Sequence, residues 1–259
     1  MPALKTLLRQ IYDRLPAILR RSLHRILVSY PVRWLKWKFM GYPDPRWFIN
    51  EKELRPHYRQ ALAYLAEKLG TDNVGDYLEF GVCRGSSMIV MHQELQEAGL
   101  DHIRLFGFDS FEGLPEDDES EWEEGSFSAH IDWVSQRLAD NHIDLDRVNL
   151  VKGFYSDSLT DDLVAKHNLS KAGVIMIDCD LYSSTVESLD FCEPLIQDEV
   201  IMIFDDWNPL AKQNKGEKRA FDEFLEKNKH FTAEETGNYD YYPGDQNGKV
   251  FKVSRVSSA

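Results

Sequence analysis

The sequence predicts an α/β fold in which one mostly parallel, seven-stranded sheet has helices on both faces and follows a helical arm. From Gly75 onward, short apolar segments alternate with segments whose apolar residues recur every three or four positions. Strands that alternate with helices form βαβ units, whose parallel sheet is buried on both faces. A sharp division of charge separates the basic first 40 of the 259 residues from the acidic remainder. We therefore expect an arm at residues 1–50 and one folded domain at residues 51–259.

The expected strands, in order, are Asp76–Val82, Ile103–Phe108, Val148–Lys152, Gly173–Ile177, Val200–Phe204, Phe231–Glu235 and Val250–Val253. The expected helices are Ser86–Ala98, Ile131–Asn141, Thr160–His167, Thr185–Leu195 and Glu217–Asn228. Only the loop Thr236–Gly248 separates the last two strands. Because this loop has no helical pattern, we expect these strands to form a hairpin at the sheet edge.

The arm at residues 1–50 is predicted to be basic, amphipathic and helical. Its apolar residues recur at helical spacing and are interrupted at Pro16 and Pro31, after which cations alternate with Trp34, Trp37 and Phe39. Such a segment can lie on an anionic membrane surface, so residues 1–40 could make a peripheral membrane contact. The alternative is a helical arm that packs on the acidic domain or on a second subunit, and we expect a homo-oligomer.

Composition and charge exclude several classes of protein. Residues 1–40 carry a net charge of +8, so the remaining residues carry −22 of the total of −14. A domain this acidic repels a phosphate backbone, which argues against nucleic acid as a partner. The longest apolar runs are only a few residues, and arginines interrupt those near the N-terminus, so neither a transmembrane helix nor a secretory signal is expected. Three cysteines without CxxC spacing indicate a reduced, cytoplasmic protein.

The residues that end the first two predicted strands are candidates for cofactor binding, because ligands of open parallel sheets bind beyond the carboxyl ends of the strands. After the first strand, Gly81 and Gly85 allow a close backbone approach, and Glu79 could accept hydrogen bonds from a ligand. This is not a GxGxxG motif, and an ordinary tight turn would look the same. Asp109, at the end of the second strand, has the position from which a carboxylate reaches ribose hydroxyls, although an Asp109-Ser110 pair can also form a local turn.

Four carboxylates follow the fourth and fifth predicted strands, which we expect to be neighbours in the sheet: Asp178, Asp180, Asp205 and Asp206. Acids this close repel one another unless a cation or a proton compensates. Mg²⁺ suits one to three carboxylates together with waters and substrate oxygens. The alternative reading makes these acids helix caps, but one cap per helix explains one acid and not a pair at each strand.

An acidic stretch, Glu116–Glu124, holds seven acids in nine residues. Charge runs of this kind are usually solvated loops, and the alternative is a mobile lid over the site.

Six strings in this order resemble the macrocin O-methyltransferase-like family. They are Glu79-Phe80-Gly81-Val82-x-Arg84-Gly85-Ser86, Asp109-Ser110-Phe111-Glu112-Gly113-Leu114-Pro115, Lys152-Gly153-Phe154-Tyr155-Ser156-Asp157-Ser158-Leu159, Ile177-Asp178-x-Asp180-Leu181-Tyr182-x-Ser184-Thr185, Asp205-Asp206-Trp207 and Gly216-Glu217-Lys218-Arg219-Ala220-Phe221-Asp222-Glu223-Phe224. Members of this family are S-adenosylmethionine- and Mg²⁺-dependent methyltransferases, several of which act on sugar hydroxyls of natural products. The resemblance implies the Rossmann-like fold of class I methyltransferases.

The resemblance also implies a role for each matching residue. The residues implied at the methionine end of S-adenosylmethionine are Glu79, Gly81, Val82, Gly85 and Ser86. Those implied around its ribose and adenine are Asp109, Ser110, Phe111, Gly153, Phe154 and Tyr155. Asp178 would adjoin the cofactor and bind Mg²⁺ with Asp205 and Asp206, while Asp180 would be the catalytic base. The basic loop Asn208–Lys215, the acidic stretch and the arm depart from the common pattern, so the acceptor is open.

The expected function is Mg²⁺-assisted O-methylation of a vicinal diol in a sugar, a natural product or a glycan. A catechol-like phenol would need the same metal, and the sequence does not separate it from a sugar. One rival reads Asp178-Cys179-Asp180 as the DxD motif of a metal-dependent glycosyltransferase, which leaves the loop after the first strand unexplained. The other rival is a non-catalytic binding module with the methyltransferase fold.

Overall fold

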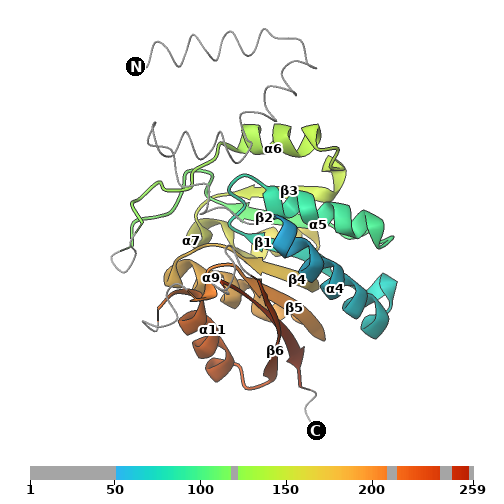
Figure 1. Cartoon of the computed structure of the whole chain (residues 1–259). Helices are drawn as coiled ribbons and strands as arrows, with labels where there is room; N and C mark the ends of the chain where they lie inside the picture. Colours follow the sequence, from blue (N-terminus) through green and yellow to red (C-terminus); the bar gives the residue numbers. More distant parts are fainter. Residues whose placement is uncertain (1–50, 118–121, 209–214, 240–246, 257–259) are drawn as a thin grey trace, which may run out of the picture. The chain divides into compact units, whose positions relative to one another are not determined.

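A seven-stranded sheet forms the centre of the domain in the computed structural model, which describes residues 51–117, 122–208, 215–239 and 247–256 (Figure 1). The strands are β1 (Asp76–Phe80), β2 (Leu105–Asp109), β3 (Val148–Lys152), β4 (Ala172–Ile177), β5 (Glu199–Phe204), β6 (Phe231–Tyr239) and β7 (Gly248–Arg255). Their spatial order is β3-β2-β1-β4-β5-β7-β6. The pairs among β1 to β5 are parallel, whereas β7 is antiparallel to both β5 and β6. The predicted fold class is confirmed, and the predicted hairpin occupies one edge of the sheet.

The hairpin strands are longer than predicted. Residues 236–239 were expected to belong to the connecting loop, but they continue β6. The pairing with β7 shifts register between Glu235 and Gly237 and then continues to Tyr239. This bulge breaks the alternation of side chains from which a strand is recognised, so the sequence-based boundary was wrong here.

Seven α-helices lie among the described residues: α4 (Glu51–Leu69), α5 (Ser86–Glu97), α6 (Ile131–Asp140), α7 (Tyr155–Ser158), α8 (Asp161–His167), α9 (Tyr182–Cys192) and α11 (Gly216–Lys227). Five correspond to predicted helices. The long helix α4 was not predicted, because it is charged on most of its surface and carries Pro56 near its start, although it buries a stripe that includes Leu54, Tyr58 and Leu62. None of these helices is long and apolar enough to cross a membrane.

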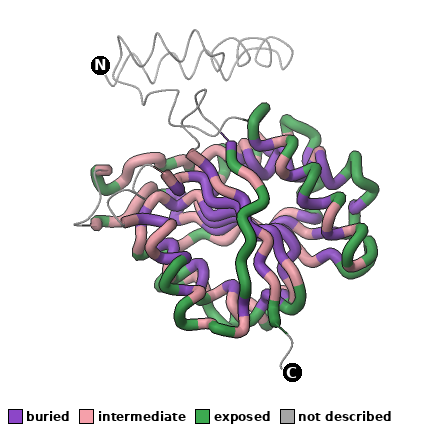
Figure 2. The backbone as a smooth tube through the Cα atoms, turned by 60° about the horizontal axis from the view of Figure 1, so that its bottom comes forward, coloured by how far each residue is buried: buried purple, intermediate pink, exposed green. Residues whose placement is uncertain are grey.

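Helices cover both faces of the sheet because strand side chains alternate between two cores. Tyr77 of β1 joins one core, in which α4, α5 and α6 bury residues such as Leu62 and Leu138. Leu78 and Phe80 join the other core, to which α9 and α11 contribute. Figure 2 shows the buried strands as a continuous band between exposed helical surfaces. Glu79 has the parity of Tyr77, so its side chain is directed toward the α4 and α5 face.

The predicted arm, residues 1–50, lies outside the described residues, as do residues 118–121 of the acidic stretch and 209–214 of the basic loop.

Candidate active site

The predicted site residues meet at one edge of the sheet because backbone hydrogen bonds join the strand ends there. The Gly153 N–H donates to the carbonyl of Asp109 over 3.0 Å, and the Gly81 N–H donates to that of Phe108 over 2.9 Å. The amide of Asp178 donates to Phe80 over 2.8 Å, and that of Asp205 donates to Ile177 over 2.9 Å. These bonds continue the parallel ladder beyond β1 to β5, which aligns the carboxyl ends of all five strands.

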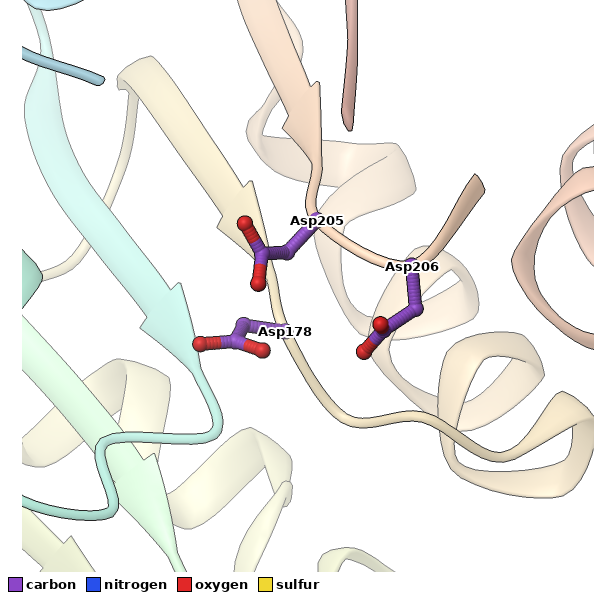
Figure 3. A group of neighbouring side chains, drawn as sticks. All are labelled: Asp178, Asp205 and Asp206. Atoms are coloured by element: carbon purple, nitrogen blue, oxygen red, sulfur yellow. The ribbon is translucent and has the colours of Figure 1, made fainter. Parts of the chain in front are cut away.

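Three aspartates form a compact cluster at this edge. Asp178 follows β4, and Asp205 and Asp206 follow the neighbouring strand β5. One carboxylate oxygen of each lies within 4.8 Å of the others, and Figure 3 shows the three carboxyl groups directed toward one another. Asp205 is buried, whereas Asp178 and Asp206 are partly accessible. The prediction that these acids lie on neighbouring strands is confirmed.

The cluster concentrates negative charge that the described residues do not neutralise. Burial is the main cause that raises the pKa of Asp178, Asp205 and Asp206, and for Asp178 the charge of Asp205 comes next. For Asp205, the charge of Asp206 is the cause that follows burial, so the aspartates raise one another's pKa by repulsion. Within the described part of the chain, no lysine or arginine forms an ion pair with any of the three. The donors are all hard oxygens, so this set fits a hard divalent cation.

Asp180 lies beside the cluster in a strained backbone conformation. Its φ of +58° falls in the left-handed region, which non-glycine residues rarely adopt. Burial and the nearby Asp206 raise the pKa of Asp180, whereas a hydrogen bond with the Trp122 side chain lowers it. Its side chain is partly accessible. Strain of this kind is commonly found at functional sites.

The described ends of the acidic stretch lie close to this site. Trp122 contacts Asp180 as described above, and Asp117 accepts a hydrogen bond of 2.9 Å from the Ser183 hydroxyl in the first turn of α9. These contacts place both ends of the stretch near the aspartates. The lid and the solvated loop both stay predictions.

Two further residues contact the cluster and were not among the predicted site residues. Glu217, in the first turn of α11, is fully buried, and its Oε2 accepts the Asp206 N–H over 3.0 Å. Its Oε1 has no hydrogen-bond partner among the described residues. The hydroxyl of Tyr239, at the end of β6, donates to Asp205 Oδ1. Glu217 lies within one of the six strings, so an acid at a buried helix start was a usable signal; Tyr239 follows the bulge and had none.

Glu79 lies beneath the loop that follows β1 and has protein partners. It is fully buried, with Oε1 accepting from the Ser87 hydroxyl over 2.5 Å and Oε2 accepting from the Tyr77 hydroxyl over 2.6 Å. Burial raises its pKa to about 8, and these two hydrogen bonds partly oppose the rise. Both oxygens of Glu79 thus have hydrogen-bond partners within the protein. The expected contact of Glu79 with a ligand stays a prediction.

The glycines of this loop are required by the chain itself. A Cβ on Gly81, whose φ is +95°, would lie 1.7 Å from the carbonyl oxygen of Asp178. A Cβ on Gly85, whose φ is +68°, would lie 3.3 Å from a Val134 methyl and 3.1 Å from a Leu138 methyl, both on α6. The guanidinium of Arg137, also on α6, donates to the Ser86 hydroxyl over 3.1 Å and to the Arg84 carbonyl. The loop is thus held between β4 and α6, and Val82 within it is buried.

Asp109 joins the loops that follow β1 and β2. Its Oδ2 accepts the Cys83 N–H over 2.8 Å, and its Oδ1 accepts the Phe111 N–H over 2.6 Å. The alternative of a local turn is confirmed, since Ser110 Oγ accepts the Glu112 N–H over 3.0 Å. Cys83 and Phe111 both have positive φ, so this corner is strained as well. Ribose binding by Asp109 and Ser110 stays a prediction.

The residues after β3 differ in exposure. Phe154 is exposed, whereas the Tyr155 ring is partly buried against Phe80 at a centroid distance of 5.8 Å. Phe154 is therefore the more accessible of the two predicted adenine neighbours, and Gly153 lies directly before it at the end of β3.

Comparison with known proteins gives this site a context. A curated relative from Streptomyces olivaceus, 8-demethyl-8-(2,3-dimethoxy-α-L-rhamnosyl)-tetracenomycin-C 4′-O-methyltransferase, is 31% identical over 157 residues, which are 56% of this chain and 58% of that protein. The match thus spans less than two thirds of the relative's length. Solved structures of methyltransferases also share the fold. The O-methyltransferase NovP has a TM-score of 0.63 at 21% identity, covering 79% of this chain and 80% of its own. A calicheamicin methyltransferase has a TM-score of 0.59 at 19% identity, covering 92% and 91%.

The sheet order, the helices on both faces and these structural matches identify the fold as that of class I methyltransferases. The family model for macrocin O-methyltransferase (TylF) matches residues 56–237, which include every predicted site residue. The chain belongs to the macrocin O-methyltransferase family.

Proposed function

We propose that this protein transfers a methyl group from S-adenosylmethionine to a hydroxyl of a sugar, or of another vicinal diol, in a natural product or a glycan, with the assistance of Mg²⁺. The observation that carries the proposal is the cluster of Asp178, Asp205 and Asp206 beside Asp180. It lies at the sheet edge from which the loops after β1, β2 and β3 also start. Support for a sugar acceptor comes from the curated relative, whose name specifies a rhamnosyl-bearing compound.

The loops after β1, β2 and β3 would hold S-adenosylmethionine, which supplies an electrophilic methyl group on a sulfonium. Asp109 ties the first two loops together through two backbone amides, so their shape is set before a ligand arrives. The residues proposed to face the methionine end are Glu79, Gly81, Val82, Gly85, Ser86 and Asp178. Those proposed around the ribose and adenine are Asp109, Ser110, Phe111, Gly153, Phe154 and Tyr155.

The three clustered aspartates would hold the cation. Their oxygens are of the right kind, lie close together and lack a cationic neighbour among the described side chains. A bound Mg²⁺ supplies Lewis acidity, which lowers the pKa of an adjacent hydroxyl and fixes its orientation. Asp205 is already oriented by the Tyr239 hydroxyl, and the backbone of Asp206 is fixed by Glu217.

Asp180 is the proposed general base. It is partly accessible at the same edge, and its raised pKa makes its ionised form a stronger proton acceptor than an exposed carboxylate. As the acceptor oxygen forms its bond to the methyl carbon, the bond from that carbon to sulfur breaks and S-adenosylhomocysteine leaves, while Asp180 would take the hydroxyl proton. General bases typically contribute about 10²- to 10⁴-fold to the rate.

Calorimetric titration of S-adenosylmethionine into the purified protein, with Mg²⁺ and then with EDTA, tests the proposal. We expect binding in both conditions, binding of S-adenosylhomocysteine as well, and methyl transfer to a sugar diol only with Mg²⁺. Full turnover in EDTA would remove the cation from the proposal. If the protein does not bind S-adenosylmethionine but releases heat when a nucleotide-sugar is added, the result favours a glycosyltransferase instead. A protein that binds S-adenosylmethionine and methylates no sugar or phenol would be a binding module.

The same proposal places the protein in the cytoplasm as a homo-oligomer, with residues 1–40 contacting either a second subunit or an anionic membrane surface. Sedimentation and liposome binding of a variant lacking residues 1–40 separate the two contacts. Loss of oligomers identifies a subunit contact, and loss of liposome binding identifies a membrane contact.

A further inference from the structure

Tyr239 contacts the cation-binding aspartates from outside the cluster. It ends β6, its side chain is 3% exposed, and its hydroxyl donates to Oδ1 of Asp205. We propose that Tyr239 is a positioning residue that sets the orientation of the Asp205 carboxylate for cation binding. This inference rests on the Mg²⁺ site of the proposed function and adds to it a residue from the antiparallel hairpin.

The phenol ring itself is held in place on two sides. Tyr239 pairs with Gly248 of β7, and a Cβ at Gly248 would lie 2.1 Å from the ring. The ring therefore occupies the space that any other residue at position 248 would fill. The His57 ring of α4 lies at a centroid distance of 5.5 Å with an interplanar angle of 42°. A ring fixed in this way keeps its hydroxyl at one point.

The fixed position of the Tyr239 hydroxyl determines how the Asp205 carboxylate can be oriented as a ligand. The backbone of Asp205 is anchored by its N–H on Ile177, and Tyr239 anchors Oδ1. The fixed backbone and the one anchored oxygen together restrict rotation of the Asp205 carboxyl group, and Oδ2 is the oxygen that does not accept from the phenol. Hydrogen bonds to the ligating groups of metal sites typically change metal affinity by about 10- to 100-fold when they are removed.

The substitution Tyr239→Phe tests the inference, because it keeps the ring on Gly248 and removes only the hydroxyl. Tyr64→Phe is the matched control: the Tyr64 hydroxyl donates over 2.8 Å to Glu199, a carboxylate at the opposite end of β5. Mg²⁺ affinity is measured by calorimetry on the full chain. The temperature is kept below the midpoint of thermal unfolding that each protein shows in EDTA. We expect Tyr239→Phe to weaken Mg²⁺ binding by about 10- to 100-fold and Tyr64→Phe to leave it unchanged.

Two results overturn the inference alone: unchanged Mg²⁺ affinity in Tyr239→Phe, or equal weakening in Tyr64→Phe, which would reduce the effect to general destabilisation. Absence of Mg²⁺ binding by the unaltered protein overturns it together with the cation site. S-adenosylmethionine affinity, measured in EDTA on the same samples, is the separate readout. If the unaltered protein does not bind S-adenosylmethionine, methyl transfer is contradicted. The comparison of Mg²⁺ affinities still decides the role of Tyr239 in that case.

Discussion

The two halves of the sheet edge treat their carboxylates differently. At the ends of β1 and β2, Glu79 and Asp109 each accept two hydrogen bonds from the chain, one on each oxygen. At the ends of β4 and β5, the aspartates face one another, and their mutual repulsion adds to burial in raising the pKa of Asp178 and Asp205. Both halves bury acidic groups, but Glu79 and Asp109 accept a hydrogen bond on each oxygen, whereas Asp205 accepts one from Tyr239 on Oδ1 alone.

This difference separates two kinds of work. A carboxylate whose acceptors are filled by the protein fixes the shape of a loop without any ligand. Carboxylates that lie close together and have few donors repel one another until protons or a cation compensate, so they can bind a cation. The first half is therefore a rigid support for the loops, and the second is a binding site. Three substitutions test this division.

Asp180→Asn should have the largest effect, because it removes the proposed proton acceptor from the half of the edge at the ends of β4 and β5. Turnover should fall by about 10²- to 10⁴-fold, while S-adenosylmethionine affinity stays at its original value. Methyl transfer is measured with S-adenosylmethionine labelled in the methyl group, and affinity is measured by calorimetry. Asp190→Asn, at an exposed aspartate of α9 that pairs with Lys227, is the control and should retain turnover. Undiminished turnover in Asp180→Asn would assign the proton to another acceptor.

Glu79→Gln tests the half of the edge at the ends of β1 and β2, through the pH dependence of the free energy of unfolding. Burial raises the pKa of Glu79 to about 8, so between pH 4.5 and 8 the folded protein holds a proton that the unfolded chain has lost. The stabilisation is full below pH 4.5 and is lost as the pH rises through 8. In the unaltered protein this group lowers the free energy of unfolding by about 3 kcal/mol from pH 5 to pH 8.

The glutamine cannot titrate, and the hydroxyls of Tyr77 and Ser87 can rotate to suit it, so this part of the pH dependence should disappear. Urea unfolding at several pH values measures it, and Glu235→Gln, at an exposed carboxylate of β6, should leave the slope unchanged. An identical slope in Glu79→Gln would show that Glu79 is ionised in the folded protein.

Arg137→Ala should have the smallest effect. It removes the guanidinium that donates to the Ser86 hydroxyl and the Arg84 carbonyl, so the loop after β1 loses one of its supports. We expect S-adenosylmethionine affinity to fall by about 5- to 10-fold, the loss of about one hydrogen bond. Gln136→Ala, one residue earlier on α6, is the matched control. If affinity is retained in Arg137→Ala, then Asp109 and the glycines suffice to hold the loop.

The sequence predicted one half of this edge better than the other. Strand boundaries and the acids of β4 and β5 follow from period and position, since a pair of aspartates after each of two neighbouring strands must converge. The surroundings of Glu79 were not predicted, because its parity places it under α4, and that helix has a mostly charged surface that conceals its apolar stripe. Tyr239 was missed for a different reason: it follows a bulge, and its partner Asp205 lies 34 residues away in the chain.

The position of β7 between β5 and β6 sets the order in which the site can be assembled during protein synthesis. The aspartates of β4 and β5 leave the ribosome first, and β6, which carries Tyr239, follows them. Yet β6 has no partner in the sheet until Gly248–Arg255 have emerged and paired with β5. On the nascent chain, the acidic cluster must therefore exist for a time without its tyrosine, as the last part of the domain to reach its final geometry.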